Sequence, residues 1–292
     1  MKSNINIDFF PKASLIVSNT CNMKCTFCCG KNIENSLEIN ETNILKMIDL
    51  LHEHGTRRIC YTGGEPLLSP HIEEYLKKSY EYGIENMLVT SDGKRLGNIS
   101  VPSEYLKYVV VSIHGIGKDH DEITSVPNSF AELENSIKKI IERNIIIISC
   151  VLTPNLKNKT EDIVLWCIEN QVKNLYFSNL FRDGLGQNYI DLNGRLSYED
   201  FTTLVNKLKN RYSEKIEITA LAYESNAQCV LMYSTGDVFV IPYFDGTNHK
   251  KHIGNLLNEN PKEVFKRFKE DKPLWSNYAA RLSKSTLFEG NS

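Results

Sequence analysis

The sequence of 292 residues lacks a long hydrophobic run and an excess of charge of either sign. Its longest apolar run, around residues 145–148, is too short to cross a bilayer. Residues 1–11 carry charge and contain no apolar core of a signal peptide. The net charge is −2, and Lys and Arg are spread evenly, so no basic stripe suggests nucleic-acid binding. We therefore expect a cytoplasmic protein with neither a membrane nor a nucleic acid as its partner.

Dinucleotide-binding glycine patterns, internal repeats and low-complexity linkers are also missing. No Gly-x-Gly-x-x-Gly follows an apolar run, which disfavours a Rossmann fold. Apolar residues make up 41% of the chain, enough for a sizeable core. The length suits one large domain, or one domain with an appendage.

Cysteine is well represented, and three of the eight cysteines lie in one loop. Cys21, Cys25 and Cys28 follow the apolar run 15–17 with the spacing C-x3-C-x2-C. In a reducing compartment such cysteines indicate ligands or buried thiols rather than disulfides. Three thiolates on one loop can converge on one soft centre, and an iron–sulfur cubane normally takes four. The pattern therefore predicts a cluster in which one iron keeps an open position.

Two plainer interpretations of this loop stay open. The three cysteines could be a chance group of small buried hydrophobes. They could also bind zinc, but structural zinc takes four ligands, usually from two paired knuckles. The nearest fourth candidate, Cys29, directly follows Cys28, so we expect its side chain to point away and to be buried and inert.

Apolar runs and amphipathic segments alternate along the first 180 residues. We expect strands at 14–17, 57–61, 86–90, 108–113, 145–152 and 175–178, and helices at 41–54, 70–81, 129–143 and 160–170. We expect Asn40 and Ser69 to cap the first two helices, and Ser129 with Glu132 to form a capping box. Six strand–helix repeats imply parallel strands with right-handed crossovers. The predicted fold is α/β, a partial (β/α)6 TIM-like barrel with a small α+β C-terminal extension.

Chemistry-bearing residues follow the predicted strand ends. The cysteine loop, the segment Thr62–Pro66, the segment 91–93 and the pair Ser112 and His114 each come directly after a strand. In parallel barrels the active site lies where the strands end. We therefore expect these segments to meet at one rim.

The same segments resemble the radical S-adenosylmethionine (radical SAM) superfamily. The cysteine loop, with Phe27 before its last cysteine, resembles the family's CxxxCxxC motif, and Thr62–Pro66 resembles its GGEP motif. Residues 111–115, 120–123 and 129–130 resemble the fifth-strand region of the SPASM/twitch branch. The resemblance covers the first 150 residues well and the remainder weakly.

The resemblance implies one [4Fe–4S] cluster on Cys21, Cys25 and Cys28, with S-adenosylmethionine on the fourth iron. One electron from a reducing partner, such as flavodoxin or ferredoxin, would release a 5′-deoxyadenosyl radical that takes a hydrogen atom from the substrate. Low-potential clusters depend on hydrogen bonds to sulfur, so we expect the backbone amides of residues 22–29 to point at the sulfides.

The resemblance also implies a set of residues that bind the cofactors: Phe27, Gly63, Gly64, Glu65, Pro66, Ser91, Asp92 and Ser112. In that set the glycines would let the backbone approach the methionine end, and Glu65 would accept from its amino group. Ser91-Asp92 is a candidate ribose contact, and Ser112 is a candidate contact for the ribose or the carboxylate. The alternatives are a plain turn before a helix, and ordinary loop capping by small polar residues.

Three residues are candidates for catalysis or substrate contact. His114 is expected to be exposed at a strand end, Arg182 follows the sixth strand, and Tyr243 follows a predicted hairpin strand. A solvated or structural histidine, a simple turn and a core aromatic are the respective alternatives. His120 is expected near the start of a helix.

We expect a barrel over residues 1–210 and an extension over 211–292. The second part faintly resembles a SPASM/twitch extension, with Cys229 before a hairpin and Gly254-Asn255 after it. Tyr243 stands where that family has a cysteine, and no cysteine lies beyond Cys229. We therefore expect one cluster only, and a remnant extension that serves as a lid or a substrate platform.

Three functions remain open. The first is a radical SAM enzyme acting on a peptide, although the cysteine loop begins by residue 21 and leaves no room for a leader-binding domain. The second is the same chemistry on a nucleotide, sugar or other small metabolite. The third is a non-catalytic iron–sulfur or zinc protein. Epimerisation, ring closure, dehydrogenation and rearrangement are all compatible with the sequence.

Overall fold

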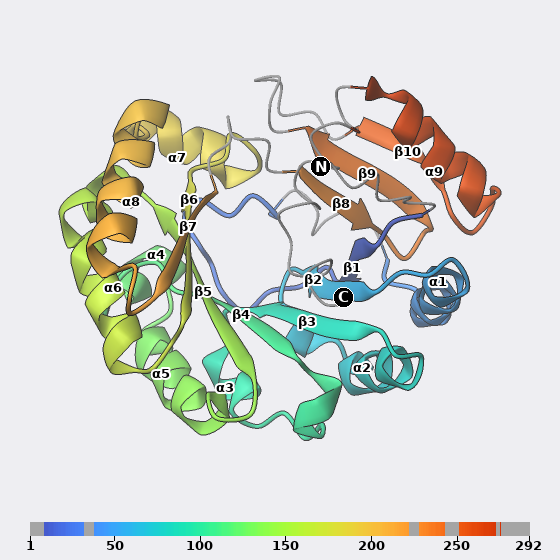
Figure 1. The fold of residues 1–292 in the computed structure, drawn as a ribbon, viewed down its shortest axis with the longest axis horizontal. Coiled ribbons are helices and arrows are strands. Elements are labelled where there is room, and N and C mark those ends of the chain that lie inside the picture. Colours follow the sequence, from blue (N-terminus) through green and yellow to red (C-terminus); the bar gives the residue numbers. More distant parts are fainter. Residues whose placement is uncertain (1–8, 32–37, 222–227, 243–250, 273–274, 276–292) are drawn as a thin grey trace.

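The computed structural model describes residues 9–31, 38–221, 228–242, 251–272 and 275. Within them one sheet has the strand order β10-β9-β8-β1-β2-β3-β4-β5-β6-β7. The strands are β1 (Lys12–Ser18), β2 (Arg58–Gly63), β3 (Glu85–Thr90), β4 (Tyr108–Ser112), β5 (Ile145–Leu152), β6 (Asn174–Asn179), β7 (Glu217–Leu221), β8 (Gln228–Met232), β9 (Asp237–Pro242) and β10 (Lys251–Asn255). Figure 1 shows the sheet curved inward with helices along its outer side.

The helices follow the strands in alternation as far as β7. They are α1 (Glu41–Glu53), α2 (Ile72–Glu81), α3 (Gly93–Leu96), α4 (Lys118–Thr124), α5 (Ser129–Ile140), α6 (Thr160–Glu169), α7 (Leu185–Asn193), α8 (Tyr198–Tyr212) and α9 (Pro261–Glu270). Short 3-10 turns lie at Pro66–Leu68, Ser103–Tyr105 and Pro154–Lys159. In the described parts of the chain, no helix is both long and apolar enough to span a membrane.

Strands β1 to β7 are all parallel, which confirms the predicted fold class. The run at 215–219, expected within the extension, forms β7, which pairs parallel with β6 and continues the barrel sheet. At the other edge β8 pairs parallel with β1, and β9 and β10 follow antiparallel. Residues from both ends of the chain therefore share one sheet, as Figure 1 shows for β1 and β8.

Burial alternates along the strands. Ile59, Val111, Ile148 and Leu175 face the helices and are fully buried in one core between sheet and helices. Their neighbours in sequence face the concave side of the sheet, because successive strand residues point to opposite faces. On that side Ile16 packs against Leu231 and Tyr233, which joins the hairpin to the barrel.

Two predicted helix caps are wrong, and one is confirmed. Asn40 accepts from Asn43 N at 2.9 Å and caps α1. Helix α2 begins at Ile72 rather than Pro70, because a 3-10 turn ending at Leu68 uses the preceding residues. Helix α5 begins at Ser129, but Ser129 Oγ donates to Asp121 at 2.9 Å and does not form the predicted capping box.

Candidate active site

The cysteine loop follows the end of β1. Cys21, Cys25 and Cys28 are half-buried thiols. Burial, together with the nearby charges of Cys28 and Cys21, raises the pKa of Cys25 to about 12. The three thiols therefore lie within electrostatic reach of one another. Cys29 is exposed, so the expectation that it is buried is wrong.

The donor set of the loop fits an iron–sulfur cluster. Such clusters are held by cysteine thiolates, and each thiolate of a cubane binds a different iron. Cys21, Cys25 and Cys28 supply three soft donors on one short loop.

The glycine motif packs against the root of the cysteine loop. A Cβ on Gly63 or Gly64 would lie well inside contact distance of the carbonyl oxygens of Ser18 and Thr20 respectively. Gly64 N donates to Ser18 O at 2.8 Å, and Glu65 N donates to Thr20 O at 2.7 Å. The close backbone approach that we expected toward a cofactor is thus also made within the chain, where it fixes the start of the loop.

Glu65 joins the ends of β2 and β3. Its Oε1 accepts from Leu67 N and Thr90 Oγ1, and its Oε2 accepts from Ser91 N, at 2.9–3.0 Å. Burial raises the pKa of Glu65 to about 7, although these hydrogen bonds oppose the shift. Its predicted contact with an amino group would add to three bonds that the carboxylate already makes.

Asp92 connects β3 to the cysteine loop. Its side chain is 1% exposed, and its Oδ2 accepts from Asn22 Nδ2 at 2.9 Å. Its Oδ1 caps α3 through Arg95 N, while Arg95 Nη1 lies 2.7 Å from Oδ2. The residue that we predicted to contact a ribose therefore holds Asn22, next to the first cysteine.

His114 is buried, 6% exposed, and not solvent-facing as we expected. Its Nδ1 accepts from Val151 N at 3.2 Å, and its own N–H donates to His120 Nδ1 at 3.0 Å. Both rings are therefore neutral, with the proton on Nε2. Burial, then the proximity of His120, lowers the pKa of His114 to about 3. The His114 ring lies 5.0 Å from the ring of Phe27.

Several backbone amides of the cysteine loop donate hydrogen bonds to backbone carbonyl groups of the protein and are not free to point toward sulfides. Lys24 N donates to Thr124 O at 2.9 Å, and Thr26 N donates to Ile123 O at 3.0 Å. Cys28 N donates to Cys25 O at 3.2 Å. The expectation that the amides of residues 22–29 point at a cluster is therefore wrong for these three.

The start of α7 holds the far end of the loop. Leu185 N donates to Cys28 O at 2.9 Å. A Cβ on Gly184 would collide with the backbone of Cys28 and Cys29, and Gly184 has φ +58°. Sequence reasoning missed Gly184 as a partner of the loop, although an Asp-Gly pair before an amphipathic segment was a usable signal.

The remaining predicted residues take separate positions in the fold. Arg182 is exposed, with Nη1 3.4 Å from Gln187 Oε1. Ser112 is half-buried on β4, opposite Ser149 of β5. Pro66 is buried and opens the 3-10 turn that Glu65 caps. Tyr243 lies outside the described residues.

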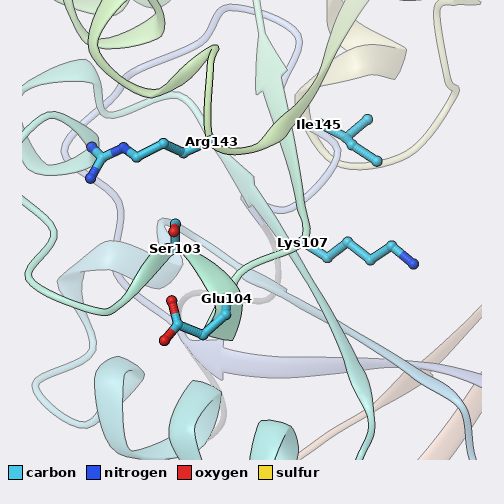
Figure 2. A pocket seen from close by; sticks show the side chains of 5 residues that line it. All are labelled: Ser103, Glu104, Lys107, Arg143 and Ile145. Carbon is cyan, nitrogen blue, oxygen red and sulfur yellow. The ribbon is translucent and has the colours of Figure 1, made fainter.

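A hollow of about 270 Å³ lies at the opposite end of the sheet. Ser103, Glu104, Lys107, Arg143 and Ile145 line it, next to the amino ends of β4 and β5. Figure 2 shows the side chains of Arg143 and Lys107 extending away from each other. Because its charged side chains point away from each other, this hollow does not resemble a ligand-binding site.

Comparison with known proteins identifies the family of the barrel. The family model described as "Radical SAM superfamily" matches residues 15–167. The chain is 26% identical over 215 residues to "Probable GTP 3',8-cyclase" of Sulfurisphaera tokodaii, covering 71% of this chain and 66% of that protein. It is 28% identical over 169 residues to "Sporulation killing factor maturation protein SkfB" of Bacillus subtilis, covering 53% and 38%. The matched part of the chain thus spans less than two thirds of the length of these relatives.

Solved structures share the fold over most of the chain. SuiB of Streptococcus suis bound to its precursor peptide SuiA has a TM-score of 0.69 at 17% identity, covering 92% of this chain and 66% of that one. The protein anSMEcpe with bound AdoMet and a Kp18Cys peptide has a TM-score of 0.68 at 18% identity, covering 91% and 82%. At such identities the likeness concerns the fold.

Proposed function

Because this chain belongs to the radical SAM superfamily, whose cofactors are a [4Fe–4S] cluster and S-adenosylmethionine, we propose that it is an enzyme that modifies a peptide by hydrogen abstraction. Cys21, Cys25 and Cys28 would hold the single cluster. When bound, the cofactors supply the radical that abstracts the hydrogen atom. The observation that carries this proposal is a loop of three half-buried thiols at the carboxyl end of a barrel strand.

The chain's own contribution is to fix that loop. The loop is held by the glycine motif, Asp92, α4 and α7. Phe27 packs with Leu180 and Ile190 in a small apolar cluster. These contacts restrict the loop, which would orient a bound group.

The concave face of β4 to β7 favours an uncharged substrate. Ser112, Ser149, Tyr176 and Thr219 are aligned across these four strands, and all four are half-buried. Hydroxyl groups can donate to and accept from peptide amides. No Lys or Arg lies among the residues that β4 to β7 turn to this face, so a phosphate would find no cation there.

The segment after β7 would contribute to the same cavity. Because β7 continues the barrel sheet, the barrel extends to residue 221 rather than 210, and we assign the part of the chain that follows to a twitch/SPASM-like extension without a second cluster. Leu231 and Tyr233 already pack against Ile16 on the concave side, which supports a platform or lid. The one electron needed per turnover would come from a flavodoxin or a ferredoxin.

A nucleotide is the second candidate substrate. Relatives include the GTP 3',8-cyclase above and "S-adenosylmethionine-dependent nucleotide dehydratase" of Flammeovirga pacifica, 27% identical over 123 residues. The exposed Arg182 at the rim could meet a phosphate from outside the strands. The lack of a Lys or Arg among the residues that β4 to β7 turn to the concave face is the reason for ranking the peptide first.

Anaerobic reconstitution tests the chemistry. We expect about four irons per chain and release of 5′-deoxyadenosine after reduction with S-adenosylmethionine. About eight irons would indicate a second cluster in the extension, and tightly bound zinc without iron would overturn the proposal. The substrate is tested by equilibrium dialysis with GTP against a library of end-blocked peptides; GTP binding without peptide enrichment would replace the peptide by a nucleotide.

A further inference from the structure

Helix α4 connects the end of β4 to the cysteine loop. It has only seven residues, between Gly117 at φ +57° and Ser125 in the left-handed region at φ +54°. A helix this short has little stability of its own, so its position depends on tertiary contacts. Two of those contacts concern the cysteine loop and β4: one through the buried side chain of His120, and one through the last two carbonyl groups.

His120 attaches the helix to the strand. Its ring is fully buried, and its Nδ1 accepts the N–H of His114, directly after β4, at 3.0 Å. Its Nε2 has no hydrogen-bond partner among the described residues. Burial of an unpaired N–H is unfavourable, and an apolar side chain would avoid it. The useful feature of this histidine is therefore the acceptor at Nδ1.

The carboxyl end of α4 attaches the helix to the cysteine loop. The last carbonyl groups of a helix lack partners within the helix. Here Ile123 O accepts from Thr26 N and Thr124 O accepts from Lys24 N. The two donors flank Cys25, so both hydrogen bonds fix the backbone on either side of the central thiol.

Ring contacts follow the same route. Phe27 of the loop lies 5.0 Å from His114, His114 lies 6.0 Å from His120, and His120 lies 6.1 Å from Phe130 of α5. The carboxylate of Asp121, next to His120, accepts from the backbone of Asn128 and Phe130. The helix is thus braced from β4 on one side and from α5 on the other.

We infer that His120 is a positioning residue for the cysteine loop: its Nδ1 fixes α4 to β4, and the last two carbonyls of α4 fix the backbone around Cys25. The inference adds to the proposed function, because the loop would place the ligand of one iron. It concerns the protein alone, however, and can be tested without a cluster.

A matched pair of variants isolates the acceptor. Asn and Leu have similar size and shape, but only Asn carries an oxygen where His120 has Nδ1. Hydrogen exchange of the Lys24 and Thr26 amides is measured by NMR in cluster-free wild type, His120→Asn and His120→Leu. We expect exchange in His120→Leu to be roughly tenfold faster than in His120→Asn, as for loss of about one net hydrogen bond. Amides of α6 serve as the internal reference.

The same variants are then reconstituted, and the electron paramagnetic resonance spectrum of the reduced cluster is recorded. We expect His120→Asn to retain the wild-type spectrum and His120→Leu to change it. Equal exchange in the Asn and Leu variants would overturn the inference. If His120→Leu does not fold, His120→Ala, which introduces no bulk, takes its place with the same expectation. Accelerated exchange in a protein that takes up no iron would support the positioning role and refute the proposed function.

Discussion

At the carboxyl ends of the strands, the buried side chains of Glu65, Asp92 and His114 each accept a backbone hydrogen bond, from Ser91 after β3, from Arg95 in α3 and from Val151 near the end of β5. At the amino ends, buried Arg58 bonds to other side chains: its Nε donates to Glu85 at 3.0 Å, and its Nη2 donates to Tyr108 Oη at 3.0 Å. Lys107 adds a second cation to Glu85. Both ends bury polar groups, but they use them differently.

At the carboxyl end the buried polar groups hold the cysteine loop and its neighbours, Asp92 through the side chain of Asn22, whereas the Arg58 network links side chains of β2, β3 and β4. The carboxyl end carries the cysteine loop, and its contacts determine the positions of Cys21, Cys25 and Cys28. The amino end carries a charged network at the base of the barrel. In parallel barrels residues at the carboxyl end serve chemistry and those at the amino end serve stability. The following variants test that division.

The largest effect is expected from removing the thiols. Cys21, Cys25 and Cys28 replaced together by Ala should leave a folded protein that takes up essentially no iron, because no thiolate of the loop remains to bind the cluster. Iron and sulfide are counted after anaerobic reconstitution. Exposed Cys29→Ala is the matched control and should retain about four irons. A full cluster in the triple variant would refute the assignment of the loop.

The second-largest effect is expected at Gly184, and comparison with Gly194 separates steric contact with the cysteine loop from backbone strain. Gly184 and Gly194 both have positive φ, +58° and +77°, but only Gly184 abuts the cysteine loop. Each Gly→Ala change should lower the free energy of unfolding by about 1–3 kcal/mol through strain. Gly184→Ala should in addition lower iron content, because its Cβ displaces Cys28.

Urea denaturation and iron counting on both glycine variants decide the point. Equal iron content in Gly184→Ala and Gly194→Ala would mean that the start of α7 does not position the loop. Reduced iron in both would point to a general loss of structure.

Local patterns predicted most of the scaffold. Strands such as β5 and helices such as α1 were found because continuous β-branched runs and amphipathic spacing are properties of a few adjacent residues. The cysteine loop and the glycine motif were placed at strand ends by the same reasoning. The start of α2 was misplaced because Ser69-Pro70 suits a helix start as well as the turn that the structure shows.

Long-range partners could not be predicted in this way. His114 was expected at the surface, yet α4 and the cysteine loop cover it; α4 follows within a few residues, but Phe27 of the cysteine loop is far away in the sequence. Serine is a common N-cap residue, but the hydroxyl of Ser129 donates its hydrogen bond to Asp121 in the preceding helix. The roles of Asn22 and Gly184 in holding the loop depend on residues 70 or more positions away.

The third prediction concerns acid stability at the carboxyl end. Burial lowers the pKa of His120 to about 4, against 6.5 in the unfolded chain. Below pH 6.5 the unfolded state binds a proton that the folded state does not, so stability falls as the pH drops toward 4. Between pH 7.5 and 5 this histidine should therefore lower the free energy of unfolding by about 2 kcal/mol. His120→Asn should therefore lose about 2 kcal/mol less than wild type over that range, by urea denaturation; an identical loss in both proteins would contradict the burial of a neutral ring.

The smallest effect is expected at the amino end. Burial alone would raise the pKa of Glu85, but hydrogen bonds from Lys107 and Arg58 lower it overall. Its contribution is therefore present above pH 4.5 and is lost as the pH falls through the lowered value, a window more acidic than that of His120. Glu85→Gln should reduce the free energy of unfolding at pH 7 by about 1–2 kcal/mol, since Arg58 stays buried with a weaker partner while Glu85 itself is partly solvated.

The control is the exposed Glu263→Gln, which removes an ion pair with Lys266 and should change the free energy of unfolding by less than about 0.5 kcal/mol. Iron content should be unchanged in both, because neither residue contacts the cysteine loop; a loss of iron in Glu85→Gln alone would show that the two ends of the barrel are coupled.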